Sequence, residues 1–360
     1  MPPSTADTLE MNTNRYEFVD SLRGMAILGV MVTHVGSMTL DGHAGLAALL
    51  RRVTVLGGMG VPLFYMVSAF TIMLMFTKRL GRETAPIGSF FIRRFMRIAP
   101  VYWGGILLYT AIYGVTGSRG WLGGPEPWHY PLHLLFLNMT NPFTPSSVVP
   151  GGWSISNEMI FYVLFPALFF LVDTPRKAAA FFIGSIALSP LFQSGADALV
   201  ASCFPTASPS EAKMFSYRWL PNQLSCFAAG FVFFHLFQRM AVPPSDLYKS
   251  STKFLVAAAL VLLPALIMLL KENLPLQENH LWITWFLLLA FAMLVYQWKP
   301  LVNKALAWVG KVSFSCYIFH FAVIELLQRV LPPMRAPVDF LVTLCLTLPP
   351  TLALAWLSYR

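Results

Sequence analysis

The feature that most constrains this chain is a series of about ten apolar runs along its 360 residues. A helix needs about 20 residues to cross the hydrocarbon core of a bilayer, and each run is near that length. The runs lie near residues 21–40, 58–77, 98–117, 157–173, 177–194, 222–238, 254–271, 281–298, 311–330 and 337–357. A further apolar piece, Leu132 to Met139, is too short to span and is a candidate re-entrant segment. The pattern predicts an all-α, polytopic bundle of about ten transmembrane helices.

The charge content supports a membrane location. Charged residues make up 11% of the chain, against about 25% in soluble domains. The formal net charge is +9, which in a soluble protein would suggest a nucleic-acid partner. Here the basic residues gather in short loops, as the positive-inside rule describes, so no nucleic acid is expected. The largest group, between Lys78 and Arg97, predicts that this loop and both termini are cytoplasmic.

The two ends of the chain suggest one domain with a short tail. Residues 1–15 are polar and lack an apolar core, so we expect a disordered cytoplasmic tail and no cleavable signal peptide. Residues 16–360 then form a single membrane domain. The four cysteines have neither a CxxC nor a metal-ligand spacing, and no metal site is expected.

His34 is an ionisable residue inside the first apolar run. Arg23 precedes it by eleven residues, which is roughly 16 Å along a helix and close to three full turns. Both side chains therefore lie on nearly the same face, with His34 just past the predicted midplane. One interpretation is a histidine that bonds between helices. The other is a general base, because neutral imidazole with a pKa near 6.5 accepts a proton from a hydroxyl.

Asp20 and Arg23 lie at the inner mouth of the same helix. They form either an interfacial anchor with a local ion pair or the start of a path that leads to His34. The basic group Arg93, Arg94 and Arg97 is open to a similar choice. It acts as a topological anchor, or it holds the phosphates of a cytosolic donor, which arginine binds with two hydrogen bonds.

Two later segments carry further candidates. In Trp153-Ser-Ile-Ser-Asn-Glu158, Ser156 is a candidate N-cap with Glu158 in the first helical turn, a position that the helix dipole favours. Alternatively, the Glu158 carboxylate orients a histidine or binds an acceptor hydroxyl. In the ninth run, His320 lies about 14 Å from Lys311 along the helix, again near the midplane.

Five motifs in order resemble the acyltransferase 3 family of bacterial integral-membrane O-acyltransferases. The first runs from Tyr16 through Asp20 and Arg23 to His34 and resembles its Arg/Lys-x10-His signature. The others are Val61-Pro-Leu-Phe-Tyr-Met-Val-Ser68-Ala-Phe70, Arg93-Arg94-x-x-Arg97-Ile-x-Pro100, Trp153-Ser-Ile-Ser-x-Glu158-x-x-x-Tyr162 and Ser313-Phe-Ser-x-Tyr317-x-x-His320. The resemblance covers residues 16 to 360. The chain departs from the pattern at Ala69, Asn157 and Met159.

The resemblance implies a bacterial inner-membrane enzyme, most simply an O-acetyltransferase, with acetyl-CoA or another acyl-CoA as the cytoplasmic donor. It implies an acceptor hydroxyl on a lipid-linked or exported glycan, or on a small molecule such as a macrolide. On this hypothesis His34, Arg23 and Glu158 are catalytic, and Arg93, Arg94 and Arg97 hold the donor phosphates. Substrate positioning falls to Asp20, Ser68, Trp153, Tyr162, Tyr317 and His320. A secondary transporter, with polar residues at the midplane, is the alternative from another functional class.

Overall fold

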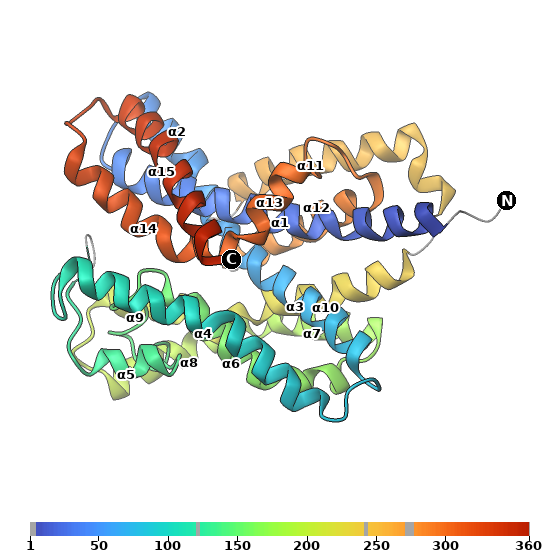
Figure 1. Ribbon diagram of the computed structural model, residues 1–360, viewed down its shortest axis with the longest axis horizontal. Coiled ribbons are helices and arrows are strands. Elements are labelled where there is room, and N and C mark those ends of the chain that lie inside the picture. The colour runs from blue at the N-terminus through green and yellow to red at the C-terminus, as the bar shows by residue number, and fades with distance from the viewer. Residues whose placement is uncertain (1–4, 120–122, 241–243, 271–276, 360) are drawn as a thin grey trace.

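The computed structural model describes residues 5–119, 123–240, 244–270 and 277–359, with side chains from residue 16 onward. Over these residues the chain is almost entirely helical and contains no strand, so the all-α prediction is confirmed (Figure 1). The elements are α1 (Thr5–Thr39), α2 (Leu46–Thr54), η1 (Val55–Met59), α3 (Gly60–Arg79), α4 (Pro86–Tyr113), α5 (His129–Leu134), α6 (Gly152–Leu171), α7 (Pro175–Ala187), α8 (Ser189–Cys203), α9 (Pro209–Arg218), α10 (Leu220–Arg239), η2 (Ser245–Tyr248), α11 (Ser250–Leu270), α12 (Glu278–Tyr296), α13 (Lys304–Lys311), α14 (Ser313–Val330) and α15 (Ala336–Tyr359).

The predicted number of spans is confirmed. Among the described residues, 8 helices are long and apolar enough to cross a membrane, and the number rises to 10 if each of two bent pairs is one span. The pairs are α7 with α8, bent by 49°, and α13 with α14, bent by 76°. A proline in the first turn of α8 accounts for the first bend, because proline fits a helix start but interrupts the helix before it. Which side of the membrane holds the termini stays a prediction.

Two boundaries differ from the sequence-based expectation. Helix α1 begins at Thr5, within the residues predicted as a disordered tail. Between Thr5 and Arg23 the chain has neither glycine nor proline, so nothing in it stops the helix from extending toward the N-terminus. The short apolar piece after Tyr130 holds only the end of the six-residue α5, and turns follow it.

Helix α1 crosses the middle of the molecule and packs against α13, α3, α14 and α15 (Figure 1). Its contact with α13 is very close. A Cβ on Gly310 would lie 1.8 Å from the carbonyl oxygen of Asp20, and one on Gly24 would lie 2.2 Å from that of Leu306. Small residues of this kind let membrane helices approach backbone to backbone. The close contact fixes the part of α1 that carries Asp20 and Arg23.

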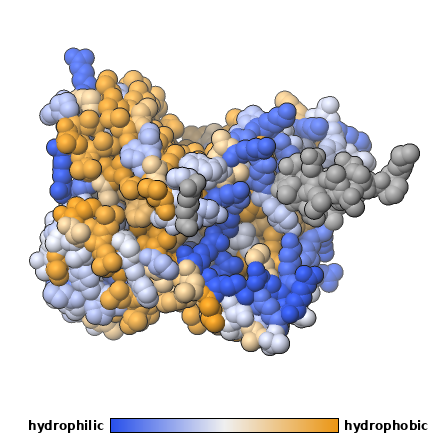
Figure 2. All heavy atoms as spheres, viewed as in Figure 1, coloured by the Kyte–Doolittle hydropathy of each residue, from blue (hydrophilic) through white to orange (hydrophobic). Residues whose placement is uncertain are grey.

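A stack of aromatic rings joins α3, α6 and α10. The Phe161 and Phe227 rings are stacked at 3.9 Å, and Tyr65 stacks on Phe227 at 4.3 Å. These three buried rings join α6 to α3 through Phe227 of α10. By contrast, the outward faces of α4 and α11 expose large apolar side chains such as Leu107 and Phe254, as expected of helices that face lipid. Figure 2 shows apolar residues over much of one end of the molecule and hydrophilic residues gathered toward the other.

Candidate functional site

Three of the predicted basic residues line the same space, which we call the arginine chamber. Arg23 of α1 and Arg94 and Arg97 of α4 line both a cavity of about 80 Å³ and a neighbouring cavity of about 280 Å³. Arg23 is held by an ion pair with Asp20 (3.0 Å) and by a hydrogen bond to Thr71 (3.0 Å). The predicted local ion pair is therefore present, and Arg23 also lines a cavity.

The fourth arginine of the predictions, Arg93, is not part of this chamber. Its two terminal nitrogens donate to the two carboxylate oxygens of Glu83, each at 3.0 Å. The Arg93 hydrogen bonds, with help from Arg79, hold the pKa of Glu83 below its usual value. Arg93 thus fastens the α3–α4 turn, and it lines neither cavity of the arginine chamber.

Glu158 does not lie in the first turn of a helix, and the prediction of Ser156 as an N-cap is wrong. Helix α6 starts at Gly152, after Gly151 with φ of 76°. Glycine adopts this left-handed conformation without penalty, so the two glycines start the helix one turn earlier than expected. The Ser156 hydroxyl instead donates to the carbonyl of Phe136 (2.7 Å). The helix-dipole explanation for Glu158 is therefore removed.

Glu158 is the acceptor of a compact network that joins α3 to α6. The Ser68 hydroxyl and the Tyr162 hydroxyl both donate to its Oε1, each at 2.5 Å, and the two hydroxyls are 3.1 Å apart. All three residues line the smaller cavity of the arginine chamber. The guanidinium carbon of Arg94 lies 5.8 Å from the centre of the Tyr162 ring. The structure thus brings together three predicted residues beside the arginines.

His34 lines a different cavity of about 420 Å³, which we call the histidine chamber. Its volume is within the range of about 300–1,000 Å³ that is typical of small-molecule sites. Trp153 of α6 and Lys213 and Arg218 of α9 contribute to its lining. Val61 and Tyr317 line both this cavity and the smaller cavity of the arginine chamber. The two chambers therefore meet at these two residues.

Tyr317 is fixed at this junction by hydrogen bonds to Ser154 of α6 and to Gly151, the residue before α6. Its hydroxyl donates to the carbonyl of Gly151 (3.1 Å) and accepts from the Ser154 hydroxyl (2.9 Å). A Cβ on Gly151 would lie 2.8 Å from the same hydroxyl. Glycine at this position is therefore required both for the positive φ and for the approach of Tyr317.

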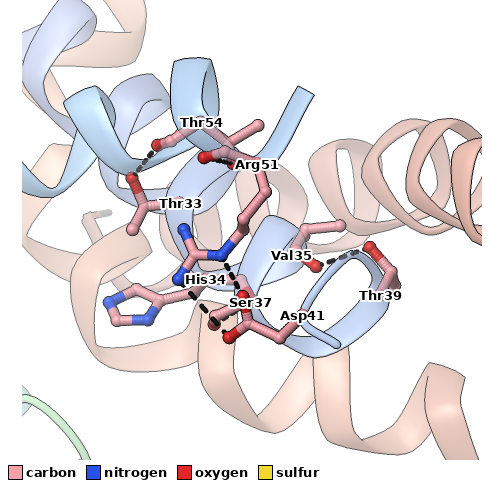
Figure 3. A network of polar contacts seen from close by, with 8 residues as sticks. All are labelled: Thr33, His34, Val35, Ser37, Thr39, Asp41, Arg51 and Thr54. Carbon is pink, nitrogen blue, oxygen red and sulfur yellow. Dashed lines mark hydrogen bonds and ion pairs between the residues drawn. The ribbon is translucent and has the colours of Figure 1, made fainter. Parts of the chain in front are cut away.

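The His34 ring has no hydrogen bond to any of the described residues, although its neighbours are fixed. Thr33 donates to the carbonyl of Thr54 (2.5 Å), and Arg51 forms an ion pair with Asp41. These contacts tie the end of α1 to α2 and the adjoining turn. Figure 3 shows the His34 ring pointing away from the Arg51–Asp41 pair. An imidazole of this kind has its ring nitrogens available to a molecule in the chamber.

His320 lies beside His34 rather than in the chamber. The two ring centres are 5.4 Å apart, and Phe321 lies 4.4 Å from the His34 ring. His320 Nδ1 faces the carbonyl of Cys316 (3.1 Å), whereas its buried Nε2 has no partner among the described residues. Neither His320 nor Glu158 is hydrogen-bonded to His34, so the predicted contacts that would orient His34 are not present.

Sequence reasoning missed Arg218 and Lys213. The carbonyl of Arg218 accepts a hydrogen bond from Asn157 (2.6 Å), and its guanidinium carbon lies 5.3 Å from the centre of the Trp153 ring. The available signal was a charge between two aromatic residues, Tyr217 and Trp219, immediately before an apolar run. The pattern resembles an interfacial anchor, and only the fold places it beside His34.

A buried histidine outside the spans supports the start of α6. Tyr102 lies 2.8 Å from Nδ1 of His133, and Nε2 lies 2.9 Å from the carbonyl of Thr144. Burial lowers the pKa of His133 to about 3, so the ring is neutral, with Nε2 as donor and Nδ1 as acceptor. A Cβ on Gly152 would lie 2.7 Å from the Tyr102 hydroxyl, which shows how closely this pair packs against α6.

Comparison with known proteins places these residues in a family. A family model described as an acyltransferase domain matches residues 16–360. The chain belongs to the acyltransferase 3 family. This confirms the resemblance that the five motifs indicated, and all five contribute residues to the two chambers, among them His34, Ser68, Arg97, Glu158 and Tyr317.

Two curated relatives are distant. One is named "Acyltransferase MdmB", from Streptomyces mycarofaciens, and is 26% identical over 166 residues, which are 44% of this chain and 40% of the relative. The other is named "Putative acetyltransferase ORF330", from Acidianus two-tailed virus, and is 23% identical over 322 residues, 89% of this chain and 87% of the relative. No solved structure matches this chain significantly.

Proposed function

We propose that this protein is a bacterial inner-membrane O-acyltransferase. It transfers an acyl group, most simply acetyl, from cytoplasmic acyl-CoA to a hydroxyl of a lipid-linked or exported glycan. One observation carries the proposal: a chamber with three arginines meets, at Val61 and Tyr317, a second chamber that contains an unpaired histidine. A donor that is anionic at one end and reactive at the other fits such a pair of chambers.

Donor binding is assigned to the arginine chamber. We assign Arg94 and Arg97, together with Arg23, to binding the phosphates of CoA through charge-assisted hydrogen bonds, because all three line this chamber. Arg93 has no part in this proposal because Glu83 occupies its guanidinium. The pantetheine arm then extends past Ser68 and Glu158 toward the junction, which puts the thioester within reach of the histidine chamber.

The acyl transfer is assigned to His34. A ring nitrogen of His34 takes the proton from the acceptor hydroxyl while the hydroxyl oxygen attacks the thioester carbonyl. The new C–O bond forms, the C–S bond breaks, and the proton passes from His34 to the departing CoA thiolate. In the relay version, a His34 ring nitrogen attacks the thioester carbonyl, the C–N bond forms, and the C–S bond breaks to release the CoA thiolate. The acceptor hydroxyl oxygen then attacks the acyl group, the C–N bond breaks, and the hydroxyl proton ends on the CoA thiol. Either version needs a ring nitrogen without a protein partner.

The remaining predicted residues are assigned to positioning. Ser68 and Tyr162 satisfy the Glu158 carboxylate, so we assign this network to fixing α3 against α6 where the acyl arm passes. Trp153 and Tyr317 line the histidine chamber and offer flat surfaces on which a sugar ring can stack. His320 packs against His34 and limits its rotation.

The test is acyl transfer by the purified protein in proteoliposomes, with acetyl-CoA labelled in the acetyl group and glycan from the host as acceptor. We expect label to enter the glycan with the wild-type protein and not with His34→Ala. Mass spectrometry of surface glycan from cells with and without the gene identifies the modified sugar. Uptake of a labelled solute without acyl-CoA, together with no acyl transfer, would instead favour a transporter.

A further inference from the structure

The histidine chamber has an uncompensated positive charge. Arg218 is half-buried at the end of α9 and lines this chamber together with Lys213. No carboxylate of the described residues forms an ion pair with either side chain, whereas Arg23, Arg51 and Arg93 each have an acidic partner. No aspartate or glutamate lines the chamber. The lining of the chamber therefore holds two cationic groups and no acidic one.

Arg218 is also held in place before any ligand arrives. Asn157 bonds to its backbone carbonyl (2.6 Å), and the Trp153 ring faces its guanidinium carbon at 5.3 Å. A guanidinium fixed in this way loses little entropy on forming two parallel hydrogen bonds.

The cost of this arrangement argues for a ligand. An arginine in a membrane-embedded bundle is expensive unless it pairs with an opposite charge or faces water. Arg51 on α2, for comparison, pairs with Asp41. Arg218 has neither an acidic partner among the described residues nor full exposure, so an anion from a bound molecule is the missing partner.

We propose that the histidine chamber binds its acceptor through an acidic group held by Arg218 and Lys213, so that the acceptor is an anionic hydroxyl compound, a sugar that carries a carboxylate or a phosphate. This inference rests on the proposed function, because it takes the ligand of the chamber to be the acyl acceptor. His34 and Arg218 line one cavity, so the acidic group on Arg218 fixes which hydroxyl of the same sugar reaches His34.

The test measures binding alone, without acyl-CoA. Wild-type protein in lipid nanodiscs is titrated against three fluorescent probes: the 4-methylumbelliferyl β-glycosides of glucuronic acid, glucose 6-phosphate and glucose. We expect at least one of the two anionic probes to bind about tenfold tighter than the neutral glucoside. Comparison of the glucuronic acid probe with the glucose 6-phosphate probe shows whether the site prefers a carboxylate or a phosphate.

Matched variants locate the effect. Arg218→Gln should abolish the tenfold preference and leave glucoside binding unchanged, and Arg218→Lys should restore part of the preference. Lys213 is exposed, so Lys213→Gln does not threaten folding and should reduce the preference about threefold. Arg52→Gln is the control, because Arg52 is exposed and does not line the histidine chamber. His34→Ala should retain the preference.

Three outcomes would overturn the inference. They are equal binding of anionic and neutral probes, binding of none of the probes, and an equal loss of all binding in a folded Arg218→Gln protein. If size-exclusion chromatography shows that the Arg218→Gln protein does not fold, the binding preference of the Lys213→Gln protein decides the test. An absence of acyl transfer in the proteoliposome assay refutes the proposed function but leaves this binding ratio unaffected, so the two failures are distinguishable.

Discussion

The arginine chamber and the histidine chamber differ in how their charges are compensated. Arg23 is tied to Asp20 and Thr71, and the Glu158 carboxylate lies in the same chamber with two hydroxyls bonded to it. In the histidine chamber, the His34 ring and the Arg218 guanidinium accept or donate no hydrogen bond to any described residue, and the bond from Asn157 reaches only the backbone carbonyl of Arg218. Arg94 and Arg97 form no ion pair among the described residues, but the chamber that they line also contains the carboxylates of Asp20 and Glu158. The lining of the histidine chamber contains no carboxylate.

The same helices nevertheless build both chambers. Helix α1 carries Arg23 and His34, and helix α6 carries Glu158 and Trp153. Val61 and Tyr317 separate the two spaces. We therefore expect changes in the arginine chamber to alter donor binding and changes in the histidine chamber to alter the transfer step. Changes at the junction should slow the transfer and leave donor binding intact.

The largest expected effect is on the transfer step. His34→Ala should lower the transfer rate about 10²–10⁴-fold, the usual contribution of general-base catalysis, and leave KM for acetyl-CoA unchanged. The measurement is transfer of labelled acetyl to glycan in proteoliposomes. His43→Ala is the matched control, because His43 is exposed in the turn after α1 and should keep full activity. Normal transfer by a well-folded His34→Ala protein would show that the histidine chamber is not where the chemistry occurs.

The next effect separates two neighbouring arginines. Arg97→Gln should raise KM for acetyl-CoA about tenfold, the effect of losing roughly 1.4 kcal/mol, which is near the lower value for a hydrogen bond to a charged group. Arg93→Gln should change this KM little, because Arg93 bonds to Glu83. Both are read from initial rates at varied acetyl-CoA. Equal increases of this KM in the two variants would contradict the assignment of Arg93 to the α3–α4 turn.

A substitution at the junction should uncouple the chambers. Val61→Phe adds a ring where the two cavities meet, so we expect a transfer rate reduced about tenfold with KM for acetyl-CoA within twofold of wild type. Val53→Phe is the control, because Val53 is exposed on α2. If Val61→Phe raises KM and leaves the rate intact, the acyl arm does not pass this residue. Overpacking is monitored by thermal melting, since it costs about 1–3 kcal/mol.

The smallest expected effect is on stability at acid pH rather than on the transfer rate. It concerns His133, which supports the start of α6, the helix that contributes to both chambers. The pKa of His133 is about 3 in the folded protein and near 6.5 in an unfolded chain. Between these values the unfolded chain binds the extra proton, so stability falls as pH falls, by up to about 1.4 kcal/mol per pH unit. His133→Gln should give a melting temperature that depends less on pH between 6.5 and 5. An unchanged slope would contradict the buried neutral ring, and His43→Gln serves as the exposed control.

Much of the architecture could be predicted because it depends on local pattern. Each predicted apolar run coincides with a helix or a bent pair of helices to within a few residues at its ends, since hydrocarbon thickness sets the length of a span. Arg23 and His34 line chambers that meet, as their helical spacing indicated. The prediction of Ser156 as an N-cap was made because serine is a common N-cap residue. It failed because Gly151, with its positive φ, is the N-cap of this helix.

The sequence by itself determined the membrane bundle, the family and the shared face of Arg23 and His34, because hydrophobic length, motif order and helical period are properties of a continuous segment. Only the tertiary structure decided which charges are compensated. Ser68 reaches Glu158 across 90 residues of sequence, Glu83 removes Arg93 from the arginine chamber, and the approach of α9 to α6 brings Arg218 into the chamber of His34. A charge is compensated by the groups that packing brings within hydrogen-bond range, and residues distant in sequence supply those groups.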